Sequence, residues 1–201
     1  MRTVHVIDDD DAVRDSLSLL MEAAGLTAHA YACAEDFLDA VERAEPGCVV
    51  TDVRMPDMSG IELLHRLSDR LDQFPVIVLT GEADVPMAVE ALKGGALDLI
   101  EKPYAAGAIL AAVTGALREL ETRRERTSRR AENSQRLAAL SAREREVLQG
   151  LLEGHSNKEI ARDLAISPRT VEAYRANLMM KMGADSLSEL VRMSLDAEGS
   201  E

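Results

Sequence analysis

The chain has 201 residues, which is enough for one large or two small domains, each with a hydrophobic core. Its apolar residues (46%) and charged residues (29%) are in proportions typical of globular proteins, whereas only 2% of the residues are aromatic, which argues against a surface that stacks the bases of single-stranded nucleic acid. The formal net charge is −13, and residues 1–120 contain 9 Lys and Arg against 22 Asp and Glu, so the acidity lies in the first part of the chain.

The cysteines and the apolar stretches favour a protein of the cytoplasm. Cys33 and Cys48 are too few for a disulfide framework and lack the spacing of zinc ligands, so we expect two reduced thiols and no zinc site. The longest apolar stretch, residues 105–117, is too short to span a bilayer. We therefore expect a cytoplasmic protein with no membrane partner.

Residues 1–120 alternate between short β-rich runs and longer amphipathic stretches. The runs are Thr3–Asp8, Thr27–Ala32, Cys48–Asp52, Pro75–Thr80 and Ala96–Ile100. The amphipathic stretches lie near 12–24, 35–44, 59–71, 84–94 and 105–120. Because nearly continuous Val and Ile runs suit strands that are covered on both faces, the pattern predicts an α/β fold with a doubly wound, five-stranded parallel sheet.

Polar side chains gather where the predicted strands end. The first run leads into Asp8–Asp11, the third ends at Asp52, the fourth ends at Thr80, and Lys102 follows the fifth. Because the functional crevice of such a sheet lies beyond the carboxyl ends of its strands, we expect these groups to converge. Neighbouring carboxylates favour a cation, and a hard divalent ion such as Mg²⁺ (or Mn²⁺) suits oxygen ligands.

A simpler interpretation applies to any one of these acids. Asp10 or Asp11 alone could cap the helix predicted from residue 12. The convergence of carboxylates, a hydroxyl and an ammonium group favours the cation site instead.

Four segments resemble the receiver domain of two-component response regulators, and their residues are similar to those of the FixJ type. These segments are IDDDDAV, TDVRMPDMSG, LTGEADVPMAVEALKGGA and DLIEKPY. The resemblance implies that Asp52 is the phosphoacceptor and that Asp9 and Asp52 are direct Mg²⁺ ligands. It also implies that Asp8 is a ligand through water and that the backbone carbonyl of Arg54 is a further ligand.

The same resemblance implies which residues bind the phosphoryl group and which position moves on phosphorylation. Thr80 and Lys102 would hold the phosphoryl oxygens, and the Lys102–Pro103 peptide would be cis. The family has an aromatic residue three positions before the lysine, whereas this sequence has Leu99, so we expect a smaller movement there. We expect Tyr104 to pack at the surface rather than replace that aromatic residue.

Two positions near the predicted site are candidates for setting how long the phosphoryl group survives. Arg54 lies two residues after Asp52, and Glu82 lies two residues after Thr80. The resemblance implies that these positions control the access of water. The alternative is that both side chains are solvated and independent, because exposed ion pairs contribute only ~0–1 kcal/mol.

A basic segment follows the predicted receiver. Residues 121–140 contain 6 Lys and Arg against 3 Asp and Glu, with no Gly or Pro. This composition is typical of a solvated helix. We therefore divide the chain into a receiver domain (1–120), a charged helical linker (121–140) and a second domain (141–201).

The second domain has the boundary signals of four helices. These signals are a capping box at Ser141–Glu144, Gly154, a cap at Asn157, Ser167 followed by Pro168, Gly183, and Ser186–Glu189. The two middle helices are close enough to form a helix-turn-helix. The segments LSAREREVL, NKEIARDLAISPRTVEAYRANLMMKMGA and SLSELVRM resemble the LuxR/FixJ-type DNA-binding domain over residues 140–195, although Tyr174 departs from the histidine common there.

The third of these helices has two distinct faces. Successive residues on an α-helix are about 100° apart, which places Val171, Tyr174, Leu178 and Met182 on one face. The opposite face holds Arg169, Glu172, Ala173, Ala176 and Met180. In the major groove, Glu172 could accept from cytosine, and Ala173 or Ala176 could contact a thymine methyl group. The residues expected at phosphates are Lys158, Thr170, Arg175 and Lys181.

These features favour a phosphorylation-dependent transcription regulator. We expect a cognate sensor histidine kinase to phosphorylate Asp52, after which a homodimer binds double-stranded promoter DNA, with RNA polymerase as a further partner. Because residues 141–182 contain 7 Lys and Arg against 6 Asp and Glu, each monomer should bind DNA weakly.

Two alternative functions fit parts of the sequence. The chain could be a Mg²⁺-dependent phosphatase of the haloacid dehalogenase type, with Asp8 as nucleophile and Asp10 as acid, but Asp52 would then have no role. It could also be a phosphorylation switch that acts through protein partners alone.

Overall fold

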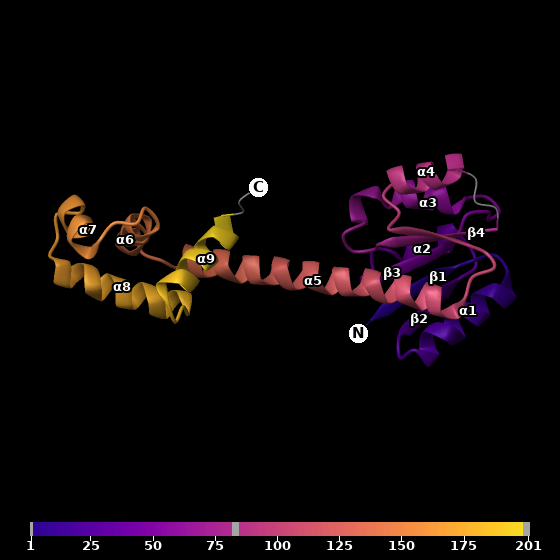
Figure 1. Cartoon of the computed structure of the whole chain (residues 1–201), viewed down its shortest axis with the longest axis horizontal. Coiled ribbons are helices and arrows are strands. Elements are labelled where there is room, and N and C mark those ends of the chain that lie inside the picture. Colours follow the sequence, from indigo (N-terminus) through magenta and orange to yellow (C-terminus); the bar gives the residue numbers. More distant parts are fainter. Residues whose placement is uncertain (1, 82–84, 199–201) are drawn as a thin grey trace. The chain divides into compact units, whose positions relative to one another are not determined.

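The computed structural model describes residues 2–81 and 85–198. The chain divides into two compact units, Met1–Arg123 and Arg124–Glu201 (Figure 1).

The first unit is built on a five-stranded parallel sheet with the strand order β2-β1-β3-β4-β5. Its strands are β1 (Thr3–Ile7), β2 (Thr27–Tyr31), β3 (Cys48–Asp52), β4 (Val76–Thr80) and β5 (Asp98–Glu101). Every residue of β1, β3 and β4 is buried, which explains why these segments are almost continuously apolar. The predicted doubly wound parallel sheet is confirmed.

Helices cover both faces of this sheet (Figure 1). They are α1 (Asp11–Ala23), α2 (Ala34–Ala40), α3 (Gly60–Arg66), the short 3₁₀ helix η1 (Ser68–Arg70), α4 (Val85–Lys93) and α5 (Ala106–Ala138). One core lies under α1 and the first turns of α5 and includes Leu17, Met21, Ile109, Val113 and Leu117. The other core lies under α2, α3 and α4 and includes Phe37, Leu63, Leu64 and Ala91.

The helix predicted near residues 59–71 is shorter in the structure, because α3 ends at Arg66 and η1 follows it. Ser59 caps α3 by accepting from the Glu62 N–H. A Cβ atom at Gly60 would lie 2.1 Å from the carbonyl oxygen of Asp52, so only glycine allows this close approach of α3 to the end of β3.

The described part of the second unit contains the last turns of α5 and four further helices. These are α6 (Ala142–Leu152), α7 (Asn157–Asp163), α8 (Pro168–Met182) and α9 (Leu187–Glu198). Their shared core includes Val147, Leu148, Ile160, Val171, Leu178 and Leu190. The capping box of Ser141 with Glu144 and the left-handed cap of Gly183 (φ 69°) both form as predicted.

The predicted cap of the second helix is wrong by one residue. Ser156, not Asn157, is the N-cap of α7. Its hydroxyl accepts from the Glu159 N–H, and the Glu159 carboxylate accepts from the Ser156 N–H. This reciprocal pair satisfies two free N–H groups, which a cap at Asn157 would not do.

The predicted last receiver helix and the predicted linker form one helix. α5 extends without interruption over 33 residues, because no Gly or Pro occurs between residues 116 and 138. None of the helices in the described part of the chain is both long enough and apolar enough to cross a membrane.

Candidate functional site

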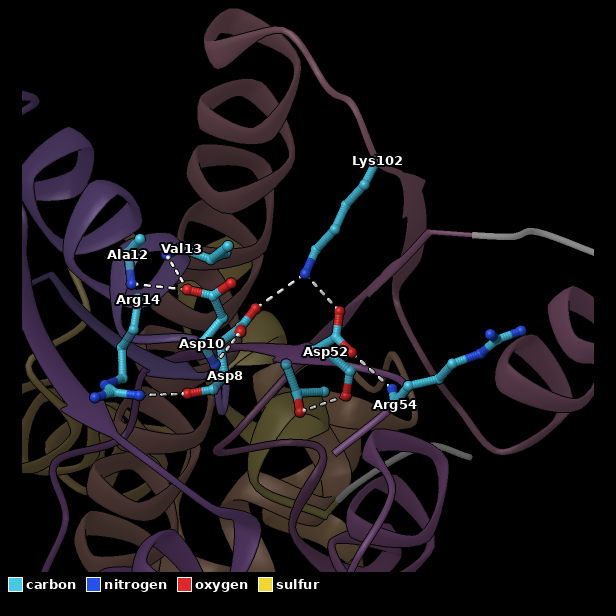
Figure 2. Close-up of polar contacts among 9 residues, drawn as sticks. Asp8, Asp10, Ala12, Val13, Arg14, Asp52, Arg54 and Lys102 are labelled. Carbon is cyan, nitrogen blue, oxygen red and sulfur yellow. Dashed lines mark hydrogen bonds and ion pairs between the residues drawn. The ribbon is translucent and has the colours of Figure 1, made fainter. Parts of the chain in front are cut away.

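Lys102 joins two aspartates at the carboxyl edge of the sheet. Its ammonium nitrogen Nζ lies 2.6 Å from Oδ1 of Asp52 and 3.0 Å from Oδ2 of Asp8 (Figure 2). Asp8 directly follows β1, Asp52 ends β3, and Lys102 directly follows β5. The structure therefore brings together three groups that lie far apart in the sequence, as their positions at the strand ends predict.

Backbone N–H groups fix the other oxygen of each carboxylate. The Asp10 N–H donates to Oδ1 of Asp8 over 3.0 Å, and the Arg54 N–H donates to Oδ2 of Asp52 over 2.7 Å (Figure 2). Each carboxylate is thus held on one side by the backbone and on the other by the ammonium group. This arrangement leaves little freedom for either side chain to rotate.

The two carboxylates differ in their access to solvent. The Asp8 side chain is 2% exposed and the Asp52 side chain is 11% exposed. Burial raises the pKa of Asp8, although hydrogen bonds from Lys102 and the Asp10 N–H oppose the shift. For Lys102, burial works against the charged form, but hydrogen bonds to Asp52 and Asp8 outweigh it and the pKa is raised. The ammonium group therefore stays charged between the two carboxylates.

The remaining aspartates of the acidic run have different surroundings. Asp9 is exposed. Asp10 is the N-cap of α1, and its Oδ1 accepts from the N–H groups of Ala12 and Val13 (Figure 2). The simpler interpretation, helix capping, therefore holds for Asp10 but not for Asp8.

Thr80 is buried at the end of β4 and contacts a methionine of α4. Its hydroxyl donates to the sulfur of Met87, with 3.5 Å between Oγ1 and Sδ. The Lys102 N–H donates to the Thr80 carbonyl over 2.7 Å, so Thr80 also adjoins the start of the segment that positions the ammonium group. Met87 and Leu99 both pack against the core under α4. No motif or spacing in the sequence singled out Met87.

Several other predictions concern the surroundings of this site. The Lys102–Pro103 peptide is cis. Tyr104 is half-buried and packs against the core under α1 and α5. The Arg54 side chain is exposed, and its predicted partner Glu82 lies outside the described residues, so their role in timing remains a prediction.

The helix α8 has the two faces predicted for it. Its buried residues are Val171, Leu178 and Met182. The residues predicted for the opposite face, Arg169, Glu172, Ala173, Ala176 and Met180, are all exposed, as are Pro168, Asn177 and Lys181. An exposed face with an acid and small side chains is free to enter a groove, because the core contacts lie on the opposite side.

The cations expected at phosphates are not equally available. Nζ of Lys181 lies 2.7 Å from Oε2 of Glu144, and Nη1 of Arg175 lies 2.9 Å from Oδ1 of Asn157. Lys158 is exposed and makes no ion pair with another described residue, and the same holds for Arg169, which was predicted on the outer face of α8 rather than at phosphates. The contact with Glu144 joins α6 to α8 and could not be predicted, because it depends on how these two helices pack.

Glu144 is strongly stabilised as a carboxylate. Hydrogen bonds from Lys181 and from the Ser141 N–H lower its pKa to about 2. The charge of Lys181 is thus matched within the domain, which makes its predicted phosphate contact weaker than its position alone suggests.

Both parts of the chain match known families. Residues 4–114 match the response regulator receiver domain, and residues 138–194 match the bacterial regulatory proteins of the luxR family. Over 192 residues the chain is 55% identical to the transcriptional regulatory protein FixJ of Azorhizobium caulinodans, which covers 96% of this chain and 91% of the relative. The chain belongs to the FixJ family of response regulators.

Other relatives of this FixJ-type regulator have the same organisation. It is 48% identical to FixJ of Rhizobium meliloti over 193 residues, covering 96% of this chain and 95% of the relative. The solved structure of response regulator StyR has a TM-score of 0.83 at 38% identity and covers 96% of this chain and 98% of that one. The solved structure of full-length FixJ from B. japonicum has a TM-score of 0.62 at 47% identity. The match covers 100% of this chain and 98% of that one.

Membership of the FixJ family decides between a transcription regulator, a phosphatase and a switch that acts through proteins alone. A FixJ-type regulator with a LuxR-type domain is a DNA-binding transcription regulator and not an enzyme. The phosphatase alternative is therefore wrong, and Asp10, its proposed acid, caps α1 instead. The luxR match also disfavours a switch that acts through proteins alone.

Receiver domains generally use Mg²⁺ for phosphorylation, and the residues of this FixJ-type receiver fit such an ion in donor type. Asp8 and Asp52 supply carboxylate oxygens, which Mg²⁺ prefers, and their burial around one ammonium group shows that this edge already favours cations. No group of three or more His, Cys, Asp or Glu side chains among the described residues is placed to hold a metal. Asp9 and the Arg54 carbonyl therefore remain predicted ligands.

Proposed function

We propose that Asp52 is the phosphoacceptor of this FixJ-type regulator and that a sensor histidine kinase in the cytoplasm supplies the phosphoryl group. The observation that carries the proposal is the contact of one ammonium group with both Asp52 and Asp8. Asp52 is the more exposed of the two carboxylates, so it is the one that an incoming phosphoryl group can reach. Asp8 is too deeply buried to be attacked without a rearrangement.

The transfer itself requires little from the protein beyond position and charge. A carboxylate oxygen of Asp52 forms a bond to phosphorus while the bond between phosphorus and the kinase imidazole nitrogen breaks, and the electron pair remains on that nitrogen, which then binds a proton. Lys102 stabilises the phosphoryl oxygens, because charge stabilisation is the main contribution to phosphoryl transfer. Asp9, Asp52 and the Arg54 carbonyl would hold Mg²⁺ directly and Asp8 would hold it through water, and the ion would supply charge that neutralises part of the same negative charge.

We further propose that phosphorylation produces a homodimer through α4 and the start of β5. Val89 and Leu92 on α4 and Leu97 just before β5 are large apolar side chains that are all exposed. Exposed apolar side chains that gather in one region are typical of a protein interface. A dimer places two α8 helices on adjacent half-sites of promoter DNA, where RNA polymerase is the further partner.

Phosphoryl uptake from acetyl phosphate in the presence of Mg²⁺ tests the assignment of Asp52. The Asp52→Asn variant should take up no phosphoryl group, measured by the mass of the intact chain. Asp57→Asn is the matched control, because Asp57 is an exposed residue of the following loop with φ 64°, a conformation that Asn adopts as readily as Asp. Full uptake by Asp52→Asn would overturn the assignment.

A further inference from the structure

Three arginines on one side of α5, in the second unit, have no side-chain partner among the described residues. Arg126, Arg129 and Arg130, here called the arginine stripe, are exposed residues of α5. Within the described part of the chain, none of the three guanidinium groups makes a hydrogen bond or an ion pair. Arg123, by contrast, pairs with Glu119 one turn earlier.

The arginine stripe occupies one side of α5. With residues about 100° apart, its members span about 100° of the helix circumference. Asn133 and Leu137, which lie seven residues after Arg126 and Arg130 respectively, are on the same side. Asn133 is only 3% exposed, and Leu137 packs against the core of the second unit. The stripe therefore continues the face of α5 that contacts the helical domain.

The end of α5 is also bonded to the end of the candidate recognition helix. Nη1 of Arg136 donates to the carbonyl oxygen of Met182, the last residue of α8, over 2.7 Å. At 1.5 Å per residue, Arg130 and Arg126 lie about 9 and 15 Å along α5 from Arg136. The arginine stripe thus belongs to the same unit as α8. It lies at a short and fixed distance along α5 from Arg136, the residue that bonds to the end of α8.

The helical domain itself has few cations available for DNA. Residues 141–182 have a net charge of +1, from 7 Lys and Arg against 6 Asp and Glu. Five of these seven cations are already engaged. Lys181, Arg143 and Arg162 pair with Glu144, Glu146 and Asp163, and the side chains of Arg175 and Arg145 donate to Asn157 and to the Ala138 carbonyl. The domain therefore has few unengaged cations to offer to phosphates, and another basic segment would add to them.

We propose that the arginine stripe binds the phosphate backbone of the DNA duplex whose bases α8 contacts. A duplex carries about one negative charge per 1.7 Å of its axis, so a row of guanidinium groups can meet several phosphates at once, each with two parallel hydrogen bonds. DNA is favoured over an acidic protein surface because the stripe belongs to the DNA-binding unit. The inference rests on DNA binding by α8 and adds a second contact surface to it.

Salt dependence of DNA binding by the full chain tests this proposal. Fluorescence anisotropy would give the affinity of the protein, treated with acetyl phosphate and Mg²⁺, for a labelled mixed-sequence duplex of about four helical turns. The variant that changes Arg126, Arg129 and Arg130 to Gln should lower the slope of log K against log salt by about 0.9 per lost contact, or roughly 2.7 in total. Gln is a good helix former, so α5 should remain intact.

A matched pair of single variants separates a specific contact from a general effect of charge. Arg130→Gln and Arg124→Gln each remove one exposed cation of α5, but Arg124 lies on the side opposite the stripe. Only Arg130→Gln should reduce the slope, by about 0.9. An equal reduction by Arg124→Gln would overturn the proposal.

The remaining outcomes also decide the question. An unchanged slope in the triple variant would overturn the proposal, and a changed monomer–dimer equilibrium with that unchanged slope would assign the stripe to a protein contact instead. If the unmodified chain bound no DNA under any condition, DNA binding by α8 would itself be wrong. A failure of DNA binding by α8 is distinguishable from a failure of the stripe proposal, because the unmodified chain shows it before any stripe variant is made.

Discussion

The hydroxyl of Thr80 donates a hydrogen bond to the sulfur of Met87, with 3.5 Å between Oγ1 and Sδ. This contact joins the end of β4 to α4, the helix that carries the exposed Val89 and Leu92. Leu99 stands where the family has an aromatic residue, and it packs against the same core as Met87. The contact thus links the predicted phosphorylation site to the predicted dimer surface.

Met87→Leu should make this receiver easier to phosphorylate. Leucine has nearly the volume of methionine but offers Thr80 no sulfur acceptor, so the hydroxyl is freer to turn toward an incoming phosphoryl group. Because a sulfur acceptor is weak, the rate of uptake from acetyl phosphate should rise only about two- to threefold, as expected for roughly 0.5 kcal/mol. Met21→Leu, in the core on the other face of the sheet, is the control. A slower uptake by Met87→Leu would contradict the prediction.

Asp8→Asn should slow phosphorylation without abolishing it. The amide oxygen can still accept from the Asp10 N–H, and Asp52 keeps its own contacts with Lys102 and the Arg54 N–H. The lost charge should nevertheless weaken the binding of Mg²⁺. The time course of uptake, measured by intact mass, would show slow but measurable labelling. Loss of all labelling at saturating acetyl phosphate and Mg²⁺ would contradict the prediction.

Glu144→Gln should remove a pH dependence from the stability of the helical domain. The folded pKa of Glu144 is about 2, against an ordinary value of 4.5, so its stabilisation is fully present above about pH 5 and is lost as pH falls toward 2. The difference in urea midpoint between the unmodified chain and the variant should therefore be largest near neutral pH and shrink in acid.

Glu146→Gln is the matched control for this experiment. Glu146 forms an exposed ion pair with Arg143 on the same helix, with 2.8 Å between the atoms. Exposed pairs contribute little, so this variant should behave like the unmodified chain across the pH range. If Glu146→Gln and Glu144→Gln lowered the midpoint equally, the contact between Glu144 and Lys181 would have no special role.

Glu172→Ala should change which DNA sequences are preferred. Glu172 lies on the exposed face of α8, where a carboxylate can accept from cytosine. Lys158→Gln should instead weaken binding to all sequences uniformly, as expected for a phosphate contact. Selection from a random pool of duplexes would show the difference. An unchanged consensus for Glu172→Ala would remove this residue from base recognition.

The sequence predicted the sheet because Val and Ile runs such as VIVLT leave few alternatives to a buried parallel strand. It also predicted the convergence of Asp8, Asp52 and Lys102, because strand ends of a parallel sheet meet at one edge. It could not predict where α5 would end, since nothing before Ser141 interrupts the helical pattern. The short turn at Ser156 contained two adjacent capping residues, and only the pairing with Glu159 distinguishes them.

Two other contacts between distant side chains could not be predicted from the sequence. The pairing of Lys181 with Glu144 and the contact of Thr80 with Met87 depend on how helices pack. Helical periodicity gives the side of a helix on which a residue lies, but not the neighbour it meets there.

The central claim is that phosphorylation of Asp52 strengthens DNA binding by joining two copies of the chain. The most direct test is an anisotropy titration with a duplex selected from a random pool by the phosphorylated protein. Phosphorylation should increase the affinity on the order of 10²- to 10⁴-fold, because the second domain then binds at high effective concentration, and Asp52→Asn should show no increase. Equally tight binding by unphosphorylated protein that sediments as a monomer would contradict the claim.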